Sequence, residues 1–257
     1  TPVDNIVPAD ATDVQRKKLS LLSKVDATFA AQTSDAQAIE AAIANYETAF
    51  RMQSTVPEIA DITREPMHIQ KLYGIDSEDT HQQLYETQAL RARRLVEAGV
   101  RFVEITCPSF DGNNSPWDQH GELKKLHEKN ARITEQSVAA LIIDLRQRGL
   151  LDETLVLWAG EMGRTPHTPS VHDNCGRDHH VNGYCLFMAG GGFRRGASYG
   201  ETDEFGNGAT VNPTTIHDIH ATILHQMGIN HEQLTFRHSG RDQRLTDVHG
   251  NVLLDIA

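Results

Sequence analysis

Carboxylates, imidazoles and an arginine occur together in three short polar segments in the second half of the chain. The candidate site residues are Asp118, His120, Glu161, Arg164, His179 and His180. Imidazole and carboxylate groups are the usual ligands of zinc, manganese and iron in proteins. An arginine beside such a metal suits a phosphate or sulfate group, because its planar guanidinium donates two parallel hydrogen bonds to an oxyanion. These residue types predict metal-assisted chemistry on an oxyanion.

The elements that must position these residues alternate between strands and helices. Short apolar runs bounded by turn residues predict strands over residues 100–106, 154–159 and 184–189. Apolar residues spaced three and four apart, followed by glycine, predict helices over residues 123–148 and 214–226. This order favours an α/β fold with a largely parallel sheet, in which sites form beyond the carboxyl ends of the strands.

The candidate residues lie in the loops that follow the predicted strands. We therefore expect the loops that carry Asp118, Glu161 and the His179–His180 pair to converge at one end of the sheet. Adjacent histidines in extended chain point to opposite sides. One of His179 and His180 is therefore expected to ligate the metal, while the other orients it or faces solvent.

Two of the segments have structural alternatives that the sequence leaves open. Asp118 and His120 have the residue types and the position to cap the helix that begins near Leu123. Glu161 has an arginine three residues further on, Arg164, with which it can form an ion pair.

Two further motifs are weaker candidates. His217 and His220 lie three residues apart at the start of a predicted helix, where their spacing also fits helix capping and core packing. The glycine run over residues 190–196 lacks the ending of a phosphate-binding loop and is interpreted as a turn. The sequence has no Gly-x-Ser-x-Gly elbow and no His-Glu-x-x-His helix, which disfavours a serine esterase or a zinc protease.

The first part of the chain has a helical pattern and carries no cluster of reactive side chains. Apolar residues spaced three and four apart predict helices over residues 14–51 and 80–98, with prolines at 57 and 66 between them. We expect residues 1–99 to form a helical region that packs on the sheet of an α/β core over residues 100–257, with one domain overall.

Composition excludes several classes of function. With 24 Lys and Arg against 35 Asp and Glu, the formal net charge of −11 argues against sequence-independent binding of nucleic acid. No apolar run approaches the roughly 20 residues of a membrane-spanning helix. Three cysteines cannot form a disulfide framework. The chain begins at Thr1, without a leader of the signal-peptide kind, and we expect a processed chain or a fragment.

Several motifs together resemble the bacterial proteins called domain of unknown function 1501. The resemblance spans residues 1–6 and most of residues 100–257, and its motifs are Trp158–Pro166, Gly176–His180, Ala189–Gly192, Tyr199–Asp203, His217–Leu224 and Gly240–Asp242. That family is grouped with the alkaline phosphatase and sulfatase superfamily. The resemblance implies an alkaline phosphatase-like three-layer sandwich, of which this chain is the C-terminal fragment, and a periplasmic or secreted location.

The resemblance also implies roles for the candidate residues. Asp118 and His120 resemble an Asp-His pair of the superfamily, at a spacing of two rather than four. Glu161 resembles the Asp of a second Asp-His pair, but Met162 stands where an imidazole is expected, and a thioether suits zinc poorly. Either His179 or His180 resembles a lone histidine ligand, and the superfamily's nucleophile is expected upstream of this chain.

These observations favour a metal-dependent hydrolase of phosphate or sulfate esters on a small molecule or a polysaccharide. Its cofactor is a divalent metal, with zinc first and calcium or manganese as alternatives, and Arg164 holds a nonbridging oxygen. The alternative is a noncatalytic protein that keeps the fold and binds a metal or another ligand, and a structural surface protein with neither property is a third hypothesis.

Overall fold

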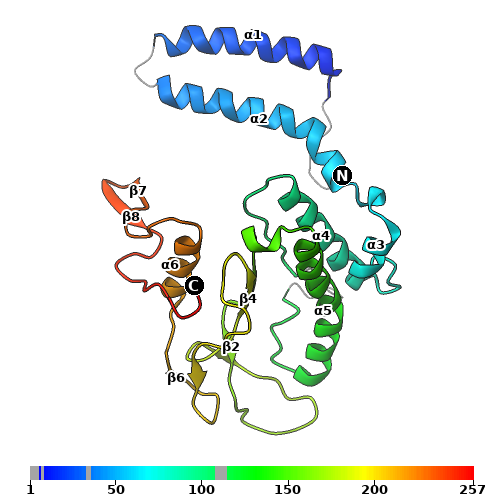
Figure 1. The fold of residues 1–257 in the computed structure, drawn as a ribbon, viewed down its shortest axis with the longest axis vertical. Coiled ribbons are helices and arrows are strands. Elements are labelled where there is room, and N and C mark those ends of the chain that lie inside the picture. The colour runs from blue at the N-terminus through cyan, green and yellow to red at the C-terminus, as the bar shows by residue number, and fades with distance from the viewer. Residues whose placement is uncertain (1–5, 7–8, 33–35, 108–114) are drawn as a thin grey trace. The chain divides into compact units, whose positions relative to one another are not determined.

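The computed structural model describes residues 6, 9–32, 36–107 and 115–257 (Figure 1). Residues 108–114, part of the segment between the strand predicted over 100–106 and Asp118, therefore lie outside the described residues. The chain divides into two compact units. One comprises Thr1–Pro66 and Arg94–Val103, and the other comprises Met67–Arg93 and Glu104–Ala257.

The first unit is built on a helical hairpin. Its elements are α1 (Thr12–Ala30), α2 (Ala36–Ala60) and the short 3₁₀ helix η1 (Ile62–Arg64). The predicted helical pattern over residues 14–51 is confirmed by α1 and α2. Helix α2 continues through Pro57, which lies only three residues before its end and removes a single backbone hydrogen bond.

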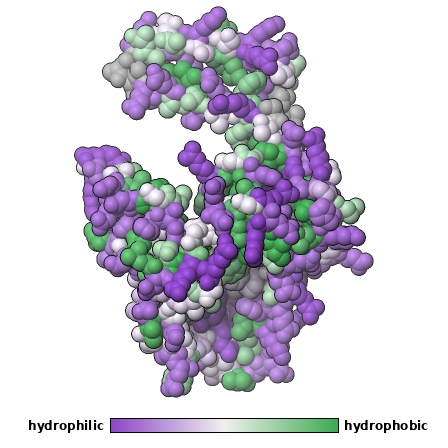
Figure 2. Space-filling view, viewed as in Figure 1, coloured by the Kyte–Doolittle hydropathy of each residue, from purple (hydrophilic) through white to green (hydrophobic). Residues whose placement is uncertain are grey.

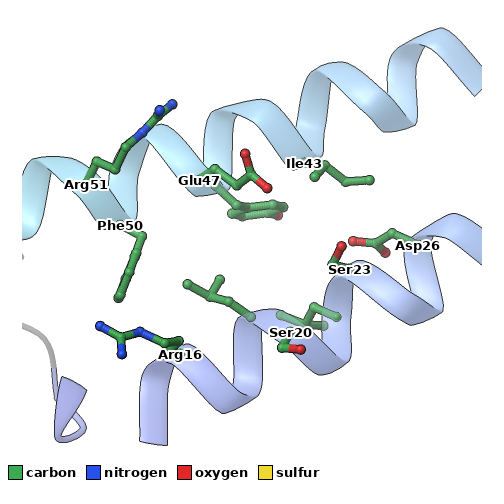
Figure 3. A pocket seen from close by; sticks show the side chains of 11 residues that line it. Arg16, Ser20, Ser23, Asp26, Ile43, Glu47, Phe50 and Arg51 are labelled. Atoms are coloured by element: carbon green, nitrogen blue, oxygen red, sulfur yellow. The ribbon is translucent and has the colours of Figure 1, made fainter. Parts of the chain in front are cut away.

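A pocket of about 390 Å³ separates the two helices of the hairpin (Figure 3). Its apolar lining comes from Leu19 and Leu22 of α1 and from Ile43, Tyr46 and Phe50 of α2. Phe50 points from α2 toward α1 in this view. The two helices thus contact each other along an apolar seam that they do not fill.

An arginine satisfies the backbone at the end of α2. Arg94 donates to the carbonyl oxygens of Glu58 and Ile59 and forms an ion pair with the buried Glu65. The last carbonyls of a helix have no partner inside the helix, and a cation there stabilises them.

The second unit has a helical layer with a buried ion pair at its centre. The helices are α3 (Met67–Tyr73), the first part of α4 (Thr80–Glu97) and α5 (Leu123–Gln147). Asp144 of α5 lies 2.9 Å from Arg93 Nε, and both side chains are about 1% exposed. It also accepts hydrogen bonds from Arg148 at 2.7 Å and from the Tyr73 hydroxyl at 3.3 Å.

The strands of the second unit form small antiparallel pairs. The pairs are β1 (Leu155–Trp158) with β4 (Phe187–Gly190), β2 (Gly163–Arg164) with β3 (His179–His180), β5 (Glu201–Thr202) with β6 (Ala209–Val211), and β7 (Thr235–His238) with β8 (Arg241–Arg244). The fold is therefore a mixture of helix and strand. Within the described residues no pair is parallel, in contrast to the largely parallel sheet and three-layer sandwich that we expected.

β1 and β4 pair antiparallel because of the segment that connects them. A parallel pair needs a crossover, usually a helix. The described chain from 159 to 186 instead contains the small β2–β3 pair, so β4 returns antiparallel to β1. The strand expected over residues 100–106 is not formed either. Its residue Phe102 is 80% exposed, and a strand without a hydrogen-bonded partner is not stable in water.

Three more predicted helices are confirmed, and the strands predicted over 154–159 and 184–189 correspond to β1 and, in part, to β4. The helix expected over residues 123–148 is α5, and the helix expected over 214–226 is α6 (Ile216–Gln226), which begins with a capping box between Thr215 and Asp218. The helix expected over 80–98 is α4. The glycine run at the end of β4 leads into a turn, and Gly190, Gly191 and Gly192 all have positive φ.

We predict that Asp144→Ala lowers the free energy of unfolding by about 3–5 kcal/mol, because it leaves the Arg93 guanidinium buried without its carboxylate. Urea denaturation followed by circular dichroism measures the change. Asp152→Ala is the matched control, since Asp152 is 78% exposed and its one ion pair within the described residues is with the exposed Arg195. That control is expected to change stability by less than about 1 kcal/mol. Equal effects of the two substitutions would contradict a central role for Asp144.

Candidate functional site

Side chains of α5 anchor the turn that carries Asp118 and His120. Asn130 of α5 donates to the Pro116 carbonyl at 2.6 Å, and the buried Gln119 interacts with His127 at 3.2 Å. These polar anchors fix the backbone on either side of Asp118. The side chains of Asp118 and His120 are left exposed on the outer side of the turn.

A backbone pairing brings a distant segment against this turn. Gly121 forms an antiparallel bridge with Cys175, and the Arg177 amide donates to the Gln119 carbonyl at 3.2 Å. The approach is close because residue 176 is glycine. A Cβ atom on Gly176 would lie 2.0 Å from the carbonyl carbon of His120, well inside van der Waals contact. No larger residue fits here without moving the backbone.

The β2–β3 pair then sets which side chains face the turn. Arg164 lies directly opposite His179, and Gly163 lies opposite His180. Opposed residues of an antiparallel pair present their side chains on the same face, and successive residues alternate between faces. Arg164 and His179 therefore point together toward Asp118. His180 points away, and its Nε2 lies 2.6 Å from the Asn207 carbonyl oxygen.

One carboxylate oxygen is the centre of the cluster. Oδ1 of Asp118 lies 2.9 Å from Nε2 of His179, 3.0 Å from Nε2 of His120 and 2.8 Å from a terminal nitrogen of Arg164. The two imidazole Nε2 atoms are 3.3 Å apart. Asp118, His120 and His179 offer ligand atoms that all lie within 4.8 Å of one another.

The surroundings orient these groups. The other imidazole nitrogen of His120, Nδ1, lies 3.3 Å from the carboxylate of Asp178. The second terminal nitrogen of Arg164 donates to the carbonyl of Trp117 at 3.2 Å. Hydrogen bonds from His179 and then from Arg164 hold the pKa of Asp118 at about 2. Asp118 is thus a carboxylate at neutral pH, as a metal ligand must be.

The structure brings together four of the six residues predicted from the sequence, namely Asp118, His120, Arg164 and His179. His180 is on the opposite face of β3. Glu161 is exposed and makes no hydrogen bond or ion pair with any described residue, so the alternative of an ion pair with Arg164 is not formed. Asp178 was not predicted as a site residue, although its position directly before His179 was a signal for it.

The capping alternative for the turn is not realised. The residue that precedes α5 is Glu122, in a left-handed conformation, and no side chain caps the helix there. His217 and His220 lie in α6, next to the buried Asp218. In the described part of the chain they join no group of three metal-ligating side chains. His217 instead lies beside His249, with ring centroids 5.2 Å apart.

We predict that Gly176→Ala separates the two halves of the cluster and lowers the free energy of unfolding by about 1–3 kcal/mol, the usual cost of overpacking. Urea denaturation gives the stability, and NMR shifts of the His120 and His179 imidazoles report the cluster. Gly160→Ala is the control, because a Cβ there meets nothing closer than 3.8 Å. If Gly176→Ala leaves both readouts unchanged, the close approach does not hold the cluster together.

Comparison with known proteins gives a family but no characterised relative. No curated protein and no solved structure matches this chain. In the part of the chain that the structure describes, no helix has the length and apolar character needed to cross a membrane. A family model described as "Protein of unknown function (DUF1501)" matches residues 2–257. The chain therefore belongs to the DUF1501 family.

Proposed function

We propose that this protein is a metal-dependent hydrolase of phosphate or sulfate esters. Asp118, His120 and His179 are the proposed metal ligands, and Arg164 is the proposed oxyanion-binding residue. The observation that carries the proposal is the convergence of two imidazoles and one ionised carboxylate on one exposed point, with a guanidinium beside them. Glu161 and His180 remain predictions from the sequence.

The donor set and its spacing fit a divalent metal. Ligand atoms at about 2.0–2.1 Å from a tetrahedral ion lie roughly 3.3 Å apart. The three separations among the donor atoms of Asp118, His120 and His179 are 2.9, 3.0 and 3.3 Å. Two imidazoles with one carboxylate favour zinc, with manganese or calcium as alternatives. Three protein ligands leave a fourth position for water or an ester oxygen.

Each residue has a distinct task in the proposed chemistry. When bound, the metal would supply a Lewis acid that polarises the ester oxygen. Asp178 fixes the orientation of the His120 ring through Nδ1, the second-layer contact that metal-bound histidines usually make. Arg164 is 22% exposed and directs its guanidinium into the cluster, where it can hold a nonbridging oxygen.

The finer expectations from the family resemblance belong to the same proposal. These are membership of the alkaline phosphatase and sulfatase superfamily with its three-layer sandwich, a periplasmic or secreted location, and an ester carried on a small molecule or a polysaccharide. What supports them is the sequence resemblance together with the grouping of Asp118, His120 and His179 beside Arg164.

A noncatalytic metal-binding protein is the second candidate, and one observation favours it. In the described residues, no serine, threonine or cysteine side chain forms a hydrogen bond with Asp118, His120, Arg164 or His179. A hydrolase without a protein nucleophile must use a metal-activated water. Metal affinity and turnover therefore have to be measured separately.

For metal binding, we predict that His179→Ala weakens Zn²⁺ affinity more than about 100-fold, beyond the 10–100-fold typical of second-layer losses. Isothermal titration of the full chain with Zn²⁺ measures the affinity. His180→Ala is the matched control, since it removes the neighbouring imidazole from the opposite face of β3. Its affinity is expected to stay within about threefold of the unmodified chain. Equal losses in the two variants, or none in either, would contradict the proposed ligand set.

For catalysis, we predict that the zinc-loaded chain hydrolyses an aryl phosphate or an aryl sulfate. Arg164→Ala is expected to lower that turnover about 10²–10³-fold, because it removes a charged donor to the oxyanion. Zn²⁺ affinity is expected to change little, since Arg164 is not a ligand. Zinc binding without turnover of either ester would contradict hydrolysis by a metal-activated water in this chain and would favour the noncatalytic candidate.

A further inference from the structure

The helical hairpin of the first unit exposes an apolar face. Five large apolar residues of α1 are between 39% and 65% exposed, namely Val14, Leu21, Leu22, Val25 and Phe29. Their spacings of seven, four and three place them along one side of the helix. On α2, Tyr46 is 62% exposed. Figure 2 shows apolar side chains at the surface of this hairpin.

The hairpin is incompletely packed by its own two helices. No residue of α1 is buried, and the seam between α1 and α2 contains the pocket of about 390 Å³ (Figure 3). Protein interiors normally leave few voids larger than a water molecule. Two amphipathic helices reach such packing most readily when two more helices close the bundle.

The charges of the two helices differ in sign. Helix α1 carries four basic residues (Arg16, Lys17, Lys18 and Lys24) against two acidic ones, whereas α2 carries three acidic residues (Glu40, Glu47 and Glu58) against one basic one. Arg16 and Glu47 line the seam inside the hairpin, and Lys18 and Glu58 pair with Asp10 and Arg64. Lys17 and Lys24 of α1 and Glu40 of α2 therefore supply the opposite charges that meet when each α1 lies over the α2 of a second copy. The reverse pairing, α1 over α1, brings like charges together.

We propose that this face binds a second copy of the same chain, and that the two hairpins form an antiparallel four-helix bundle about a two-fold axis parallel to the helices. In this arrangement every helix has antiparallel neighbours of opposite charge. A face the length of α1 and two helices wide buries roughly 1,100 Å² over both copies, above the roughly 1,000 Å² of a specific interface. This inference is independent of the proposed hydrolase activity.

An anionic membrane fits the same face less well. Amphipathic helices that bind such membranes depend on an excess of basic charge. The chain has a formal net charge of −11, and α2, which shares the face, is acidic. Binding to a lipid surface is therefore an outcome of the test rather than a part of the proposal.

Sedimentation velocity of the full chain over the micromolar range tests the proposal, and a concentration-dependent dimer is expected. The double variant Leu21→Asp/Val25→Asp should weaken the dimer at least roughly tenfold, because it places two carboxylates in the apolar face. Neither residue lines the pocket between α1 and α2, so the hairpin itself keeps its internal contacts. Val171→Asp is the control, since Val171 is 91% exposed outside the hairpin.

A charge-reversal variant tests the electrostatic complementarity of α1 and α2 separately. Lys17→Glu/Lys24→Glu reverses two basic positions of α1 and is expected to weaken the dimer, with helicity unchanged by circular dichroism. A monomer at all concentrations, or a dimer that survives Leu21→Asp/Val25→Asp, would overturn the proposal. Sedimentation with vesicles of anionic phospholipid separates the rival, because co-sedimentation of a monomer would show a lipid-binding face instead.

Discussion

The candidate site depends on one close contact between two stretches of backbone. Gly176 packs against the carbonyl of His120, at a distance that leaves no room for a side chain. Around it, backbone hydrogen bonds join residues 119–123 to residues 174–177. This contact fixes the position of β3 relative to the Asp118 turn. Every distance within the cluster follows from that placement and from the Arg164–His179 register of β2 and β3.

Electrostatics within the cluster explains why it forms before any ligand arrives. A single oxygen of Asp118 interacts with three nitrogen groups, and these interactions lower the pKa of the carboxylate to about 2. Because His120, His179 and Arg164 already contact Asp118, a metal ion would have to displace these contacts in order to bind. A cation would replace the attraction that now holds the two imidazoles to Asp118, and it would free Arg164 for an anion. Asp118, His120 and His179 are all exposed in the described structure.

The sequence predicted the helices better than it predicted the sheet. Helices α5 and α6 are recognisable because apolar spacing reports a helix face directly. The imidazoles and carboxylate of the cluster were proposed from their residue types and from their positions after predicted strands. Strand pairing depends on partners distant in sequence, so the antiparallel return of β4 onto β1 was not predictable from short apolar runs. Glu161 was placed in the site by a rule for parallel sheets, and β1 is not in one. The sequence left open which of His179 and His180 faces the site; in the structure His179 lies opposite Arg164, and His180 lies opposite Gly163.

X-ray absorption spectroscopy of the zinc-loaded chain tests the central claim most directly, because it reports the ligands of the ion without reference to activity. We predict a shell of nitrogen and oxygen atoms at about 2.0–2.1 Å, with the multiple-scattering pattern of two imidazoles and no sulfur. That result would match ligation by Asp118, His120 and His179. A sulfur shell at about 2.3 Å, or a shell with no imidazole, would place the metal elsewhere and contradict the account.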